Sequence, residues 1–190
     1  MRIMERRAEK RVHPPVDVVL DFALWPADMV VPAKLPLTAL RAPTACRDGG
    51  QQLTLADVAS IGLGVRLKGQ PDLLERLHGL DAFYVYLKLH EYRPEASRAA
   101  LSLFFHADIA WAECVPECLT MGLRVRHLGR GAAQEKALEF LDVSTFGVKE
   151  LAGWIDALCR GGLGPDAARP VSGLHLDTLL AEPELTLPTR

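Results

Sequence analysis

The feature that most constrains the fold of this chain is a run of strict alternation near its middle. The apolar residues Phe83, Val85, Leu87 and Leu89 alternate with Tyr84, Tyr86, Lys88 and His90. Successive side chains on a strand point to opposite faces of a sheet, so a period of two predicts a β-strand. An isolated strand is not stable, and the chain must therefore supply partner strands for this one.

Other segments have the composition of short strands. We predict further strands at residues 16–25, 35–41, 52–57, 62–68, 99–111 and 120–128. Asp48-Gly49-Gly50 is typical of a tight turn, which indicates a hairpin between 35–41 and 52–57. Residues 12–33 are compatible with a strand of the barrel, an added strand or a loop.

Two segments have the pattern of helices. Residues 71–77 follow Pro71 at a favourable first position and end near Gly79. Residues 148–160 place apolar side chains on one helical stripe and stop at Gly161-Gly162. Short strands followed by one amphipathic helix predict a mainly β fold, a small six-stranded antiparallel barrel with a C-terminal helix. We divide the chain into a basic lead-in (1–34), the barrel with its helix (35–160) and a loose tail (161–190).

Composition narrows the class of function. The 190 residues carry a net charge of −2, which does not favour DNA, RNA or an acidic membrane surface as partner. No apolar run is long enough to cross a bilayer, and the charged amino terminus lacks the apolar core of a signal peptide. Four scattered cysteines are typical of reduced thiols. We therefore expect a cytoplasmic protein.

Two motifs carry a resemblance to a known family, and the ligand chemistry given for them is what that resemblance implies. Arg7-x-x-x-Arg11 supplies forked donors that fit guanine O6 and N7 or a phosphate. The second motif is Asp57-Val58-Ala59-Ser60-Ile61-Gly62, in which the carboxylate can accept from guanine and the glycine allows close backbone approach. Together with Met121-Gly122-Leu123-Arg124-Val125, these motifs resemble the PilZ family, small bacterial β-barrel domains of which many bind cyclic di-GMP.

The resemblance implies a PilZ-like barrel that acts as a cyclic di-GMP receptor and signals to an unidentified protein partner. The implied ligand-binding residues are Arg7, Arg11, Asp57, Gly62 and Ser60, with Arg41 and Arg66 as accessory donors. No cofactor, metal or catalytic chemistry is expected. The alternative is a protein-interaction adaptor that does not bind nucleotide.

The chain departs from the family pattern at two points. Ala59 stands where the family has serine, and the arginines lie one segment upstream of the expected place near Lys34. Either residues 12–33 are an insertion that loops back and leaves the arginines near Asp57, or the barrel has lost its arginine pair.

Three further patterns have structural interpretations. Asp142-Val143-Ser144-Thr145-Phe146-Gly147 matches the second motif more literally, but a predicted helix follows, so we expect its polar residues to cap that helix. Cys114-x-x-x-Cys118 with His106 or His127 lacks metal-site spacing, and we expect free cysteines. His90 and His106 are expected at the surface or the barrel rim, and Tyr84 and Tyr86 to pack rather than stack on a base.

Overall fold

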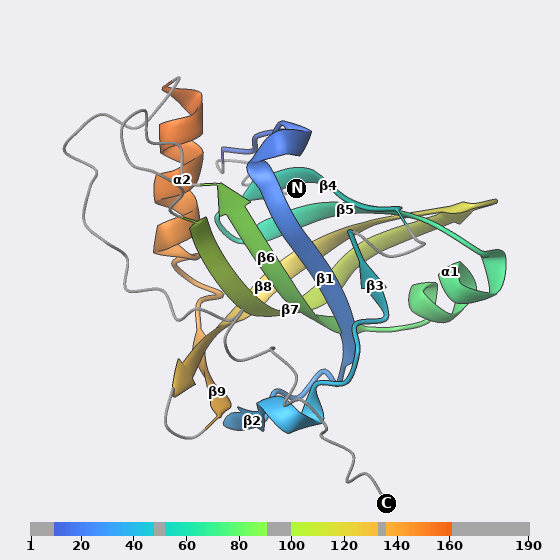
Figure 1. Ribbon diagram of the computed structural model, residues 1–190, viewed down its shortest axis with the longest axis horizontal. Helices are drawn as coiled ribbons and strands as arrows, with labels where there is room; N and C mark the ends of the chain where they lie inside the picture. Colours follow the sequence, from blue (N-terminus) through green and yellow to red (C-terminus); the bar gives the residue numbers. More distant parts are fainter. Residues whose placement is uncertain (1–9, 48–51, 91–99, 133–135, 161–190) are drawn as a thin grey trace, which may run out of the picture.

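An antiparallel sheet dominates the fold (Figure 1). The computed structural model describes residues 10–47, 52–90, 100–132 and 136–160. Within these ranges there are nine strands: β1 (Val19–Ala27), β2 (Lys34–Pro36), β3 (Ala45–Cys46), β4 (Gln52–Ala59), β5 (Gly62–Lys68), β6 (Ala82–His90), β7 (Ala100–Val115), β8 (Cys118–Ala132) and β9 (Ala137–Asp142). The helices are η1 (Val16–Val18), η2 (Leu37–Ala39), α1 (Pro71–His78) and α2 (Lys149–Cys159).

The long strand β8 organises the sheet. One of its edges pairs with β7, and the other pairs first with β5 and then with β9. The main path runs β2-β9-β8-β7-β6-β1-β3, and β4 continues from β5. All pairs are antiparallel, and the sheet curls into a half-barrel.

The concave inner face holds the main hydrophobic core. Alternate residues of the strands point into it, such as Phe22 on β1, Phe83 on β6 and Phe105 on β7. Helices α1 and α2 lie at opposite ends of the curled sheet (Figure 1). Leu74 of α1 and Trp154 of α2 contribute to the same core, so the helices complete the burial that the open sheet alone could not provide.

Part of the outer face carries a second, smaller core, which we call the outer aromatic cluster. Its buried members are Ala23, Trp25, Leu35, Leu37, Tyr84, Tyr86, Phe104 and Leu138. Strand β2 and helix η2 place Leu35 and Leu37 over it, with β2 paired to β9. Both faces of β6 are therefore buried, and Tyr84 and Tyr86 pack as expected.

Several sequence predictions are confirmed. The strand at 62–68 is β5, the alternating segment is β6, and the helix predicted at 71–77 is α1. The fold is mainly β. Residues 12–33 contain β1, which lies inside the sheet between β6 and β3. The tail at 161–190 lies outside the described residues, and no described helix has the length and apolar character needed to span a membrane.

Two predictions are wrong. The described sheet has nine strands rather than six: β3, which has two residues, and β9 lie outside the predicted strands, and β2 takes up only the first part of the strand predicted at 35–41. The expected hairpin between 35–41 and 52–57 does not form: residues 35–36 pair with β9, and β4 pairs with β5. Helix η2 follows Pro36 and ends the extended run after two residues.

Candidate functional site

The lead-in before β1 lies along the end of β4. Arg11 Nη1 donates a hydrogen bond to Asp57 Oδ1 at 2.9 Å. Next to this ion pair, Val12 and Val58 exchange backbone hydrogen bonds of 3.0 and 2.9 Å. His13 Nδ1 lies 2.8 Å from the Ala56 carbonyl oxygen. The structure therefore brings Arg11 back to the Asp57 motif, while Arg7 lies outside the described residues.

Three glycines form a flat patch beside this ion pair. Gly62 and Gly64 lie on β5, and Gly64 is the cross-strand partner of Gly122 on β8. A methyl group on Gly64 would collide with the Asp57 carboxylate, and one on Gly122 would collide with the Trp111 indole. The Asp57 carboxylate and the Trp111 indole therefore lie directly on the backbone and cover these glycines, which are buried. Only glycine permits so close an approach.

Alternation along the strands explains why the patch faces outward. Leu63, Val65, Met121 and Leu123 point into the inner core. The residues between them must then point to the outer face. We call this surface the glycine platform. It consists of Gly62, Gly64 and Gly122, bordered by Arg11, Asp57, Arg66, Trp111 and Arg124.

The platform is rich in positive charge. Arg66 and Arg124 are exposed, and no described residue forms a hydrogen bond or ion pair with either guanidinium. Arg126 is instead paired with Asp108. Asp108 is also the cross-strand partner of Arg124, so the arginines Arg11, Arg66, Arg124 and Arg126 face the carboxylates Asp57 and Asp108. This excess of positive charge favours an anionic ligand.

Trp111 is the residue of the platform that sequence reasoning did not single out. Its side chain is 50% exposed, whereas Trp25 and Trp154 are 6% and 4% exposed. It lies opposite Gly122 in the β7–β8 register, next to a β-bulge. Only the register places an aromatic side chain on the glycine patch, and no local pattern in the sequence predicts that register.

Two other predicted ligand residues lie elsewhere. The Ser60 carbonyl accepts a hydrogen bond from the Val148 amide at 2.9 Å, and its hydroxyl lies against Gly147, whose φ is +71°. Ser60 thus faces the start of α2. The Arg41 carbonyl accepts from Trp25 Nε1 at 2.6 Å, which places Arg41 beside the outer aromatic cluster.

The literal copy of the motif at 142–147 forms a turn. The Asp142 carboxylate accepts hydrogen bonds from the Ser144 hydroxyl and amide, and these bonds lower the pKa of Asp142. The N-cap of α2 is Val148, which has no side-chain capping bond. The predicted capping role of Ser144 is therefore wrong, since Asp142 engages that hydroxyl within the turn.

The histidine and cysteine predictions have mixed outcomes. His90 is exposed, as expected, but His106 is fully buried and its Nε2 donates to the Asp28 carbonyl at 2.8 Å. His106 lies 5.5 Å from His127, centroid to centroid, and the pKa of His127 is lowered by burial and then by His106. All four cysteines are free. In the described ranges, no three His, Cys, Asp or Glu side chains gather as a metal site.

Comparisons of the chain with protein-family models, with curated proteins and with solved structures find no match. The described chain is thus defined by its own geometry: a mainly β protein with a curled antiparallel sheet and a cationic glycine platform on the outer face.

Proposed function

We propose that this protein is a PilZ-like receptor that binds cyclic di-GMP on the glycine platform and passes the signal to a protein partner. The observation that carries the proposal is the Arg11–Asp57 contact at 2.9 Å beside Gly62 and Gly64. Of the residues that the family resemblance implies, Arg11 is far in sequence from Asp57 and Gly62, yet these three residues lie together.

The chemistry of this pair matches guanine. A carboxylate accepts from the N1–H and amino groups of guanine, and a guanidinium donates to O6 and N7. The Arg11 and Asp57 side chains are 58% and 21% exposed. An exposed ion pair of this kind contributes only about 0–1 kcal/mol, so a ligand can replace it at low cost.

The rest of the platform suits the shape and charge of a cyclic dinucleotide. The half-exposed Trp111, whose indole lies over Gly122, is available for stacking on a base. Arg66 and Arg124 can bind the two phosphodiesters by paired hydrogen bonds. No bond of the ligand is broken in this scheme.

Calorimetric titration of the full chain with cyclic di-GMP tests the proposal. We expect Asp57→Asn and Arg11→Ala each to weaken binding by about 10- to 100-fold, the loss of one charge-assisted contact. Arg41→Ala is the matched control, because it removes the same charge from a residue beside the outer aromatic cluster. Equal losses in Arg41→Ala and Arg11→Ala would contradict the proposed site.

Tryptophan fluorescence gives a second readout at the platform. We expect saturating cyclic di-GMP to quench emission in the parent protein and to have little effect in Trp111→Phe, since the other two tryptophans are buried. Quenching that persists in Trp111→Phe would place the ligand elsewhere. No heat and no thermal shift at high ligand concentration would favour the adaptor alternative.

A further inference from the structure

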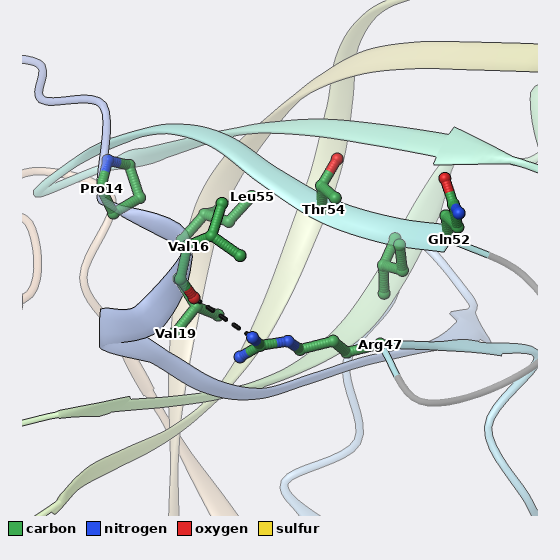
Figure 2. Close-up of a pocket in the computed structure, with 8 residues that line it drawn as sticks. Pro14, Val16, Val19, Arg47, Gln52, Thr54 and Leu55 are labelled. Carbon is green, nitrogen blue, oxygen red and sulfur yellow. Dashed lines mark hydrogen bonds between the residues drawn. The ribbon is translucent and has the colours of Figure 1, made fainter.

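A pocket of about 220 Å³ lies apart from the glycine platform, at the seam of the half-barrel (Figure 2). The seam is the line along which β1 and β3 approach β4 without a described backbone ladder between them. The lead-in closes one end of this line through the Val12–Val58 bridge. The pocket occupies the neighbouring stretch, against residues 52–55 of β4.

The walls of the pocket are mainly apolar. Leu53 and Leu55 of β4 and Val19 of β1 are buried side chains that form its deeper part. Pro14 and Val16 form the rim, and Val16 is 74% exposed. The pocket is therefore partly open, and its interior is apolar. Replacing water there with apolar ligand atoms is favourable for binding.

Arg47 gives the pocket a positive charge. It is the one ionisable residue among the described side chains that line the pocket. Figure 2 shows Arg47 extended along the pocket, with its guanidinium beside Val16, and Nη2 donates to the Val16 carbonyl at 3.2 Å. A guanidinium has five N–H donors, so this single bond leaves the fork able to bind a carboxylate.

We propose that the pocket binds a small monocarboxylate, with its carboxylate on Arg47 and its apolar body against Val19, Leu53 and Leu55. A dry cavity of about 150 Å³ accommodates benzene, so this pocket fits an apolar body of about six to eight carbons. The proposal does not depend on cyclic di-GMP binding, because the pocket and the platform share no residue.

A homologous series of alkanoates, from butanoate to dodecanoate, tests the pocket in the full chain by calorimetry or by NMR chemical shifts. We expect affinity to rise about fourfold for each added methylene and then to level off near eight carbons, when the pocket is full. Octanamide, which has the same body without the charge, should bind at least about tenfold more weakly than octanoate. Affinity that is independent of chain length, or equal for acid and amide, would overturn the proposal.

Two variants locate the ligand. Arg47→Gln should weaken octanoate binding by about tenfold or more while leaving octanamide unchanged, and Arg41→Gln should change neither. Val16→Glu places a tethered carboxylate at an exposed rim position beside Arg47, so it should also weaken octanoate without threatening the fold. Unchanged octanoate affinity in Val16→Glu would overturn the proposal even if Arg47→Gln failed to fold.

Phenylpropanoate distinguishes a ring from a chain as the apolar body. Tight binding of phenylpropanoate or octanoate with dependence on Arg47 supports the proposal. Failure of both to bind at millimolar concentration contradicts it.

Discussion

The outer face of the sheet has two halves that use the same strands in different ways. In the covered half, Tyr84, His106 and His127 stand side by side across β6, β7 and β8, under the segment that carries Leu35 and Leu37. In the open half, a row on the same β7 and β8 runs from Trp111 through Gly122 to Gly64 and Asp57.

β-Bulges separate the two halves. Strand β7 is irregular between His106 and Ala107 and again between Ile109 and Trp111. Such bulges re-aim side chains and increase local twist. One half gains stability from packed aromatic rings, and the other leaves Arg66, Arg124 and part of Trp111 exposed. Substitutions can test that division, and we take them from the largest expected effect to the smallest.

Phe104 in the covered half should be the most costly side chain to truncate. It is fully buried, and its ring centroid lies 5.8 Å from Tyr84 and 6.0 Å from Trp25. We expect Phe104→Ala to lower the free energy of unfolding by about 3–5 kcal/mol, measured by urea denaturation. Trp111→Ala in the open half should lower it by less than about 1 kcal/mol. If Phe104→Ala and Trp111→Ala lowered the free energy of unfolding by similar amounts, the two halves would not differ in their contribution to stability.

Substituting one glycine in each half by alanine should give a smaller difference in the free energy of unfolding than the Phe104 and Trp111 variants give. A methyl group on Gly129 would lie 3.0 Å from Phe104 Cδ1 and 3.3 Å from the Phe104 carbonyl oxygen, within packed surroundings. We expect Gly129→Ala to cost about 1–3 kcal/mol in urea denaturation. The nearest atoms to a methyl group on Gly64 belong to the Asp57 carboxylate, the end of a side chain that can rotate away. The cost of Gly64→Ala should therefore stay below about 1 kcal/mol. The reverse order would show that the platform is the rigid half.

The covered half should also make stability depend on pH. Burial, and then His106, lower the pKa of His127 below 6.5, while Asp142 and Asp108 oppose this and Arg126 adds to it. The unfolded chain therefore binds the proton more tightly, so stability is complete above about pH 6.5 and falls below it. The test is to measure the free energy of unfolding by urea denaturation at pH 7.5 and at pH 5.5. Between these two pH values, His127→Gln should lose less unfolding free energy than the parent protein. His78 is exposed, so His78→Gln serves as the control. If His127→Gln lost as much unfolding free energy as the parent protein, His127 would not be the source of the pH dependence.

The Arg11–Asp57 pair should have the smallest effect on stability. Both partners lie in the open half and are partly exposed. We expect Arg11→Ala to change the free energy of unfolding by less than about 1 kcal/mol, and the difference to shrink further in high salt. A larger, salt-independent loss would mean that the lead-in is a structural part of the sheet.

The sequence predicts the parts of this fold that depend on neighbours along the chain. The β5 strand, the β6 alternation and α1 with Pro71 at its start follow local rules. The pairing of Leu35 with Leu138 joins segments about one hundred residues apart, and no local pattern encodes such a register.

The candidate site divides in the same way. The family resemblance singles out Arg11, Asp57 and Gly62, and the structure brings them together. Trp111 reaches Gly122 only through the bulged register of β7 and β8. Ser60 is turned toward α2 by the backbone bond to Val148, a contact that its own motif does not predict.

The central position of β1 has a consequence for the order of folding. The partner of this strand is distant in the sequence: β6 pairs Ala82 with Ala27 and Leu89 with Val19. Such distant partners carry a large loop-closure entropy, which slows their formation. The β4–β5 and β7–β8 hairpins need no distant segment. We therefore expect these hairpins to form early. The β1–β6 pairing and the β5–β8 pairing, which joins Gly64 to Gly122 and completes the glycine platform, should form later.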